Sequence, residues 1–444
     1  MRDRIQAIRG MNDILPNDAP KWHNLEQTFA RCMRAYGYQE IRFPILESTS
    51  LFKRTIGDLT DIVEKEMYTF LDLNQESMSM RPEGTAGCIR ACLEHGLLHN
   101  QQQKLWYAGP MFRYEKPQKG RYRQFHQFGV EALGFSGVGV ELELILICQR
   151  LWAALGIRDG LQLQINTLGV LEERQAYRQT LIDYFSQYQD ILDEDCKRRL
   201  QRSPIRILDS KNPALADMIA AAPKLMDSLG DASRQHFAEL TAGLDALGIS
   251  YHINPTLVRG LDYYGHTVFE WVSDRLGAQA AVCAGGRYDV LVEQLGGQPT
   301  PAVGFGLGVE RLLLLMENLG IAAPDAHQAS VFMITDGEQY VSQALALAEQ
   351  LRQDCDYDVV VYLGQGRMKS QFKQADKSGA RFALILGEQE IQEQTISIKD
   401  LRQLGEQKMV QQSMLKQAMK MAFDQEWSLI PGVLSEEKKC LPFT

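Results

Sequence analysis

Two strand-like segments near residues 104–115 and 121–133 constrain the fold of this chain most strongly. The basic, turn-forming run from Lys116 to Gly120 joins them, which predicts an antiparallel hairpin with a long polar tip. Because side chains alternate across a strand, one face of this hairpin gathers polar and aromatic residues beside the space left by Gly129. The residues of that face that bear on function are Arg113, Glu115, Arg121, Phe125, Gln127 and Glu131. The pattern predicts either the floor of a ligand site, with Gly129 leaving room for the ligand, or a solvated sheet face with chance charges.

The remaining pattern before residue 321 predicts a mixed structure of strands and helices. Helical spacing covers residues 17–36 and 84–99, and a strand at Gln39–Phe43 stops at Pro44. Charges rise and strand signals vanish from about 171 to 250, which predicts an inserted helical module. Further strands are predicted at 263–273, at 280–288 and at Val303–Gly308, the last opening into a helix at Val309–Leu319.

The C-terminal third of the chain has a different organisation. After a linker-like stretch at 321–328, strands and helices alternate in the order β-α-β-α-β, which predicts a separate small α/β domain. The expected strands are 331–335, 359–363 and 382–386, and the expected helices are 341–353 and 367–377. Residues from about 423 to 444 carry mixed polar signals and are expected to form a loosely held tail.

Composition places the chain among ordinary globular proteins. Its 444 residues are 45% hydrophobic and 23% charged, with a net charge of −9, which leaves room for local basic patches but not for a uniformly basic coat. The eight cysteines include no Cys-x-x-Cys, so a reducing compartment is the simpler interpretation. No secretory signal and no bilayer-spanning segment are recognised in the sequence, so we expect a cytoplasmic protein without membrane contact.

The run Arg259-Gly260-Leu261-Asp262-Tyr263-Tyr264 combines an arginine fork with two tyrosine hydroxyls in a short polar loop. An arginine fork binds phosphate or carboxylate, and a tyrosine hydroxyl donates or accepts a hydrogen bond. This combination predicts a site for an anion beside a small polar ring, although a simple turn remains the alternative.

Three further patterns in the sequence could be taken for binding sites. Lys369, Lys373 and Lys377 form a basic stripe on one helix face, which indicates either a solvated surface or contact with nucleic acid. The glycine-rich run that starts at Gly364 lacks the spacing of a phosphate loop. Cys88, Cys92, His95 and His99 would spread over about 16 Å of one helix, too far to surround one ion, so no metal site is predicted.

Taken together, the motifs resemble those of class II aminoacyl-tRNA synthetases. Phe112-Arg113-Tyr114-Glu115 with Arg121 and Phe125 resembles motif 2, and the run Gly304 to Arg311 resembles motif 3. Residues 36–44 resemble motif 1, the segment that forms the dimer in that class. The Arg259–Tyr264 run and Ala284-Gly285-Gly286-Arg287-Tyr288-Asp289 resemble signatures of the histidyl-tRNA synthetase family, and the similarity extends from about residue 6 to 420.

The resemblance implies a fold and a reaction. The fold would be a class II antiparallel catalytic core at 1–325 with the helical insertion at 171–250, followed by an anticodon-binding α/β domain at 326–422 and a tail at 423–444. The enzyme would attach L-histidine to its cognate tRNA through a histidyl-adenylate, using ATP with Mg²⁺, as a homodimer. The rival reading is a non-catalytic regulatory relative, which typically loses the C-terminal domain and some of the arginines that this chain retains.

The resemblance also implies roles for individual residues. Arg113, Arg259 and Arg311 would be catalytic, with Arg113 and Arg259 at the α-phosphate. The ATP site would be formed by Arg113, Glu115, Arg121, Phe125 and Arg311. The histidine site would be formed by Glu83, Thr85, Gln127, Glu131, Arg259, Tyr263 and Tyr264, with Glu131 and Tyr264 at the imidazole nitrogens. Lys369, Lys373 and Lys377 would contact tRNA.

Overall fold

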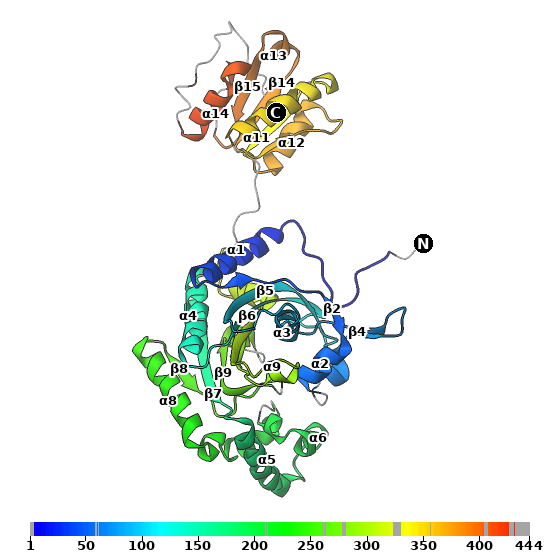
Figure 1. Cartoon of the computed structure of the whole chain (residues 1–444). Coiled ribbons are helices and arrows are strands. Elements are labelled where there is room, and N and C mark those ends of the chain that lie inside the picture. The colour runs from blue at the N-terminus through cyan, green and yellow to red at the C-terminus, as the bar shows by residue number, and fades with distance from the viewer. Residues whose placement is uncertain are drawn as a thin grey trace. The chain divides into compact units, whose positions relative to one another are not determined.

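A computed structural model gives the fold of the chain in two compact units, Met1–Pro324 and Asp325–Thr444 (Figure 1). The structure describes residues 4–57, 60, 62–208, 210, 212–259, 261, 263–277, 281–322, 330–355, 357–403, 407–425 and 430. Most of the expected linker and nearly all of the expected tail lie outside the described residues, as do Gly260 and Asp262 of the arginine–tyrosine loop.

Among the described residues of the first unit, eight strands form one sheet in the order β1-β5-β6-β11-β10-β9-β7-β8. Their bounds are β1 Gln39–Glu40, β5 Gln103–Phe112, β6 Gln124–Leu133, β7 Gln162–Thr167, β8 Tyr251–Ile253, β9 Gly265–Val272, β10 Ala281–Arg287 and β11 Ala302–Gly308. Neighbouring strands are antiparallel except for the β1–β5 and β7–β8 pairs. The predicted hairpin is therefore confirmed as β5 and β6, whereas the strand predicted at Gln39–Phe43 is only two residues long.

Side-chain alternation gives this sheet two different faces. On β6, Phe128, Val130 and Ala132 enter one hydrophobic core, while Gly129 and Glu131 face the other way. Helices α1 (Ala19–Ala35) and α4 (Gly139–Ala154) cover the first face, where Phe29 stacks on Phe128 with ring centroids 4.4 Å apart (Figure 1). The second face carries a further hydrophobic cluster, which includes Leu105, Tyr107 and Met111 of β5, together with Gly129 and Glu131 of β6.

Other helices complete the first unit. Their bounds are α2 Thr49–Ile56, α3 Thr85–Glu94, α5 Leu171–Phe185, α6 Glu194–Arg202, α7 Ala216–Ala220, α8 Asp231–Ala246, α9 Leu291–Gln294 and α10 Val309–Asn318. A small sheet adds β2 Leu46–Ser48, β3 Thr69–Leu71 and β4 Ser77–Met80 in the order β2-β4-β3. Helix α3 packs on the second face of the large sheet, so the segment before its first turn lies near Gly129 and Glu131 on that face (Figure 1).

The second unit is a five-stranded sheet with helices on both faces, as far as the structure describes it. Its elements are β12 Val331–Thr335, α11 Val341–Cys355, β13 Val359–Val361, α12 Met368–Lys377, β14 Phe382–Leu386, α13 Glu388–Gln392, β15 Thr395–Asp400, β16 Lys408–Gln411 and α14 Leu415–Phe423. The three predicted strands and two predicted helices are present. The two antiparallel strands β15 and β16 and helices α13 and α14 were not predicted.

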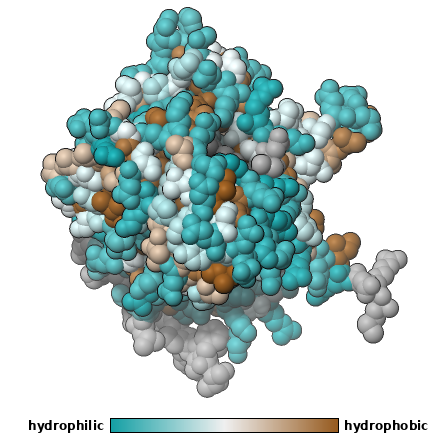
Figure 2. Space-filling model, turned by 90° about the horizontal axis from the view of Figure 1, so that it is seen from below, coloured by the Kyte–Doolittle hydropathy of each residue, from teal (hydrophilic) through white to brown (hydrophobic). Residues whose placement is uncertain are grey.

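The surface seen from below is mostly hydrophilic, with small separate hydrophobic patches (Figure 2). Within the described parts of the chain, no helix is both long and apolar enough to cross a membrane.

Candidate active site

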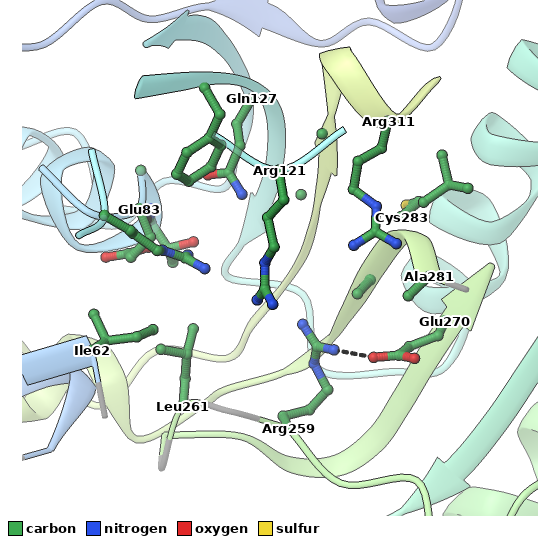
Figure 3. Close-up of a pocket in the computed structure, with 18 of the residues that line it drawn as sticks. Ile62, Glu83, Arg121, Gln127, Arg259, Leu261, Glu270, Ala281, Cys283 and Arg311 are labelled. Carbon is green, nitrogen blue, oxygen red and sulfur yellow. Dashed lines mark hydrogen bonds and ion pairs between the residues drawn. The ribbon is translucent and has the colours of Figure 1, made fainter. Parts of the chain in front are cut away.

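A cavity of about 360 Å³ opens over the polar face of the large sheet (Figure 3). Its walls come from the segment before α3, the β5–β6 hairpin, the loop before β9, strands β9 and β10, and the junction of β11 with α10. Eleven of the predicted residues line it, namely Glu83, Thr85, Arg113, Glu115, Arg121, Phe125, Gln127, Arg259, Tyr263, Tyr264 and Arg311. The folded chain thus collects side chains that are up to 228 positions apart, from Glu83 to Arg311, around one space.

Arginines reach this space from separate elements, and Figure 3 shows Arg121, Arg259 and Arg311 pointing into it. Two of them have carboxylate partners there. Arg259 is ion-paired with Glu270 of β9, and Arg121 Nε lies 2.5 Å from Glu115 Oε2. Guanidinium groups that are oriented by carboxylates in a confined space can bind a multiply charged anion.

Arg113 is oriented by the backbone and by an aromatic ring. Its Nε donates to the carbonyl of Pro82 at 2.8 Å, and its Cζ lies 5.2 Å from the centre of the Phe125 ring. Its Nη1 is 3.9 Å from Glu115 Oε1. Since Pro82 directly precedes Glu83, this hydrogen bond ties the arginine-lined side of the cavity to the segment that enters α3.

Arg311 enters from the first turn of α10, directly after the glycine strand β11. Burial, followed by the nearby charge of Arg121, lowers the pKa of Arg311, as expected for two guanidinium groups that share a site. The preceding Glu310 accepts hydrogen bonds from the backbone N–H of His126, at 2.9 Å to each oxygen, and lies 2.9 Å from His126 Nδ1. These contacts fix the start of α10 against β6.

Glu131 does not line the cavity; it lies directly beneath the residues that do. Its Oε1 accepts from Thr85 Oγ1 at 2.8 Å and from Tyr107 Oη at 3.0 Å, and its Oε2 accepts from the hydroxyl of Tyr288. Burial raises the pKa of Glu131 to about 8, although these hydroxyl donors favour the ionised form. A buried acid that three hydroxyls address is suited to sense a polar ring above it.

The two tyrosines of the predicted loop are buried next to this acid. Their ring centroids are 4.8 Å apart, and the guanidinium of Arg259 lies 5.3 Å from the centre of the Tyr264 ring. Burial raises the pKa of both Tyr263 and Tyr264, so their hydroxyls stay protonated and able to donate.

The glycines of the site do different jobs, and the prediction that Gly129 leaves room for a ligand is wrong. A Cβ at Gly129 would lie 2.1 Å from the Tyr107 ring, and one at Gly304 would lie 2.0 Å from Glu131 Oε2. These two glycines therefore make room for side chains of the protein itself. Among the described glycines that line the cavity, Gly306 and Gly308 are those where a Cβ would meet its nearest atoms only at ordinary contact distances, 3.7 and 3.5 Å.

Three important residues were missed from the sequence. Tyr107 lies on β5 two positions before Gly109, on the face already judged polar, so strand alternation alone indicated it. Tyr288 belonged to a recognised signature but received no role. Glu270 is a single carboxylate in the apolar strand β9, and such an isolated charge is itself a signal for a buried partner.

The raised pKa of Glu131 predicts how stability depends on pH. Between about pH 4.5, the ordinary value, and about pH 8, the unfolded chain has lost this proton while the folded chain keeps it. The contribution of Glu131 to the free energy of unfolding is therefore fully present at low pH and is lost as pH rises toward 8. The midpoint temperature of thermal unfolding of the wild type, compared with that of Glu131→Gln, should decrease as the pH is raised from 5 to 8. If the midpoint temperatures of the two proteins keep a constant difference across this pH range, the raised pKa of Glu131 is contradicted.

A cavity lined by arginines from a β-hairpin and from a strand–helix junction, on an antiparallel sheet, defines the catalytic domain of a class II aminoacyl-tRNA synthetase. The sequence matches the family model described as histidyl-tRNA synthetase over residues 10–312 and the anticodon binding domain model over 328–421. The chain belongs to the histidyl-tRNA synthetase family.

Comparison with individual proteins agrees with this membership. The chain is 63% identical over 401 residues to the histidine–tRNA ligase of Legionella pneumophila strain Philadelphia 1, covering 90% of this chain and 94% of that protein. Its structure is similar to that of apo S. aureus histidyl-tRNA synthetase, with a TM-score of 0.78, 37% identity, and coverage of 93% of this chain and 99% of that chain. A Bacillus halodurans C protein described as ATP phosphoribosyltransferase regulatory subunit/histidyl-tRNA synthetase shares the fold, with a TM-score of 0.62, 22% identity, and coverage of 87% and 99%.

Proposed function

We propose that this protein activates L-histidine with ATP and transfers it to the cognate tRNA. The observation that carries the proposal is that one cavity combines a group of arginines with a buried acid next to it. An arginine-lined space for a polyphosphate lies directly above Glu131, a buried acid held by three hydroxyls. ATP and an amino acid with a polar ring fit these two parts.

In the activation step, the carboxylate oxygen of histidine bonds to the α-phosphorus of ATP and pyrophosphate leaves. The nucleophile is already anionic, so the protein has to position the reactants and stabilise the charge that builds up at phosphorus. We assign Arg113 and Arg259 to the α-phosphate, and Arg121 and Arg311 to the γ-phosphate. Phosphate oxygens would take over the guanidinium groups that Glu115 and Glu270 now hold.

Phe125 would stack on the adenine ring, and Glu115 would accept from its amino group. Mg²⁺ would enter with ATP as part of the nucleotide substrate. The carboxylates of Glu115 and Glu270 on the cavity wall are the hard oxygen donors that this ion accepts.

Histidine would be read by groups below and beside the phosphates. Glu83, Thr85 and Gln127 would bind its α-amino group, and Tyr263 and Tyr264 would lie along the ring. Glu131 with Tyr264 would address the two imidazole nitrogens. A site that hydrogen-bonds a polar substrate group rejects analogues without that group by about 10⁴–10⁵-fold, so no editing step is required.

For the whole chain, we place the catalytic domain at 1–325 with its insertion at 171–250, and the anticodon-binding domain at 326–422. We also propose a homodimer that forms through residues 36–44, and a cytoplasmic location. The regulatory alternative has no specific support, because the arginines of the anion site and the second unit are all present.

The second unit offers a basic helix face for tRNA. The side chain of Gln371 bonds to both backbone groups of Thr335, at 3.0 and 2.7 Å, which holds α12 on the sheet with Lys369, Lys373 and Lys377 exposed. Replacing these three lysines with glutamine should raise the KM for tRNA about tenfold or more. It should also reduce the log–log salt slope of tRNA binding by about 2 to 3, because each lysine releases counterions at a phosphate. Filter binding at several salt concentrations measures this.

The lysine variant should leave histidine activation unchanged, since that step needs no tRNA. Lys420→Gln, an exposed position on α14, serves as the matched control and should bind tRNA as the wild type does. An unchanged salt slope in the triple variant would remove these lysines from the tRNA surface.

The direct test of the function is histidine-dependent exchange between ATP and radioactive pyrophosphate. We expect exchange with L-histidine, none above background with the other proteinogenic amino acids, and histidylation of the cognate tRNA when it is added. Exchange with a different amino acid but not with histidine would refute the proposal.

A further inference from the structure

A buried group of charged side chains lies behind the end of β10, among residues that do not line the cavity. Arg287 is 1% exposed and Glu141 of α4 is fully buried. Arg287 Nε donates to Glu141 Oε1 at 2.9 Å, and Arg287 Nη1 donates to Asp289 Oδ1 at 3.1 Å. Burial disfavours the charged form of Glu141, yet a hydrogen bond with His236 and the charge of Arg287 bring its pKa below the ordinary value. The buried pair is therefore ionised.

This group brackets Tyr288 in the chain. Arg287 and Asp289 are its two neighbours, and Asp289 Oδ1 accepts from the N–H of Ala302 at 2.8 Å. The N–H of Tyr288 donates to the carbonyl of Ala302 at 2.8 Å. Both sides of Tyr288 are thus fixed, and from this backbone its hydroxyl reaches Glu131. The Arg287–Glu141 pair therefore helps to hold the backbone of Tyr288, whose hydroxyl is one of the three hydrogen-bond donors to Glu131.

A side chain from the helical segment 171–250 completes the group. His236 of α8 places Nε2 at 3.1 Å from Glu141 Oε2. Its ring also packs on His266, with centroids 4.9 Å apart, and His266 follows Tyr264 by two residues. One histidine of α8 therefore contacts the supports of two tyrosines next to Glu131.

We propose that Glu141, Arg287, Asp289 and His236 form a positioning network that holds Tyr288 on Glu131 and so sets the affinity for the imidazole of histidine. This inference rests on the proposed function. The network touches no substrate and acts through Tyr288. It gives the helical segment a direct route to amino-acid selection, because His236 belongs to that segment.

Glu141→Gln tests the network with a nearly isosteric change. The KM for histidine in pyrophosphate exchange should rise about tenfold, as expected when a hydrogen bond between charged groups is lost, while the KM for ATP stays within about twofold. Glu143→Gln is the matched control, because Glu143 lies two residues along the same helix and pairs with Lys104 at 2.7 Å instead. The control should keep the wild-type KM for histidine.

Glu141→Gln removes the buried carboxylate that pairs with Arg287 and leaves the pair with Asp289, so His236→Ala provides a milder variant at a partly exposed position. It should raise the KM for histidine about threefold or more. His236→Gln, whose amide can donate near the position of Nε2, should restore much of the affinity. In a Tyr288→Phe background, Glu141→Gln should add no more than about a twofold effect, since the hydroxyl on which the network acts is gone.

Three results would overturn the proposal while leaving the function intact. They are a full tenfold effect of Glu141→Gln in the Tyr288→Phe background, equal changes in the KM for histidine and for ATP, and wild-type KM values in both Glu141→Gln and His236→Ala. Failure of the proposed function is distinguishable, because the wild-type protein would then show no histidine-dependent exchange at all.

Discussion

Arg259→Ala is expected to reduce histidine-dependent pyrophosphate exchange by about 10³-fold, which corresponds to about 4 kcal/mol of transition-state stabilisation. Two effects add in this variant. The guanidinium that would face the α-phosphate is removed, and Glu270 on the cavity wall loses the positive charge of this ion-pair partner where phosphate must bind. A negative charge in that place repels the nucleotide as well as failing to stabilise the transition state.

Two further variants separate chemistry from folding. Arg259→Lys keeps a positive charge near Glu270 but lacks the fork, so it should lose about 10- to 100-fold. Arg275→Ala removes an exposed arginine three residues after the end of β9, the strand that carries Glu270. This variant should catalyse pyrophosphate exchange at the wild-type rate. Circular dichroism checks that all three proteins are folded. Turnover of folded Arg259→Ala within about threefold of the wild type would refute the assigned role.

Glu131→Gln is expected to raise the KM for histidine by about 10²-fold. The effect is expected above about pH 8, where Glu131 is ionised and its carboxylate accepts from Thr85, Tyr107 and Tyr288. An amide has a single acceptor oxygen and would direct its NH₂ group at hydroxyls that are already donating. Leaving buried donors unpaired costs about 1–3 kcal/mol each, which accounts for an effect of this size. Pyrophosphate exchange over a range of histidine concentrations measures it.

The KM for ATP provides the internal control for Glu131→Gln, because Glu131 does not line the cavity into which the arginines point. Tyr107→Phe removes one donor and should show a smaller loss of the same kind. A KM for histidine close to the wild-type value in Glu131→Gln would mean that the buried acid does not read the substrate.

Much of the site could be predicted because strand alternation and short motifs are local properties. The hairpin face was assigned from the period of two, and Arg113, Arg121, Phe125 and Gln127 do line one cavity. Arg259 and Arg311 were placed beside them only through the family resemblance. Periodicity does not state which distant strands become neighbours, so the β6–β11–β10 order had to come from the structure.

The errors have a common physical origin in packing between segments that are far apart in the chain. The space at Gly129 belongs to Tyr107 because residues 107 and 129 are directly paired between β5 and β6. Glu131 was predicted on the same sheet face as Gln127; it does not line the cavity and is bonded to Thr85 and Tyr107, which do, and its role toward the imidazole stays a prediction. Strands β15 and β16 were missed because they are short segments whose partners complete the apolar pattern only after folding.

The arrangement of Tyr107 and Glu131 among Gly84, Gly129 and Gly304 has a consequence for anyone who wishes to change the amino acid that this enzyme accepts. Glu131, the group that would distinguish one amino-acid substrate from another, lies behind the residues that line the cavity. The glycines around Tyr107 and Glu131 leave no space for even a methyl group. Substitutions in the cavity wall alone would alter how tightly a substrate is held but not what the buried acid demands of it. A new specificity would require Glu131, its hydroxyl partners and the glycines to change together, which is a large step for evolution or for a designer.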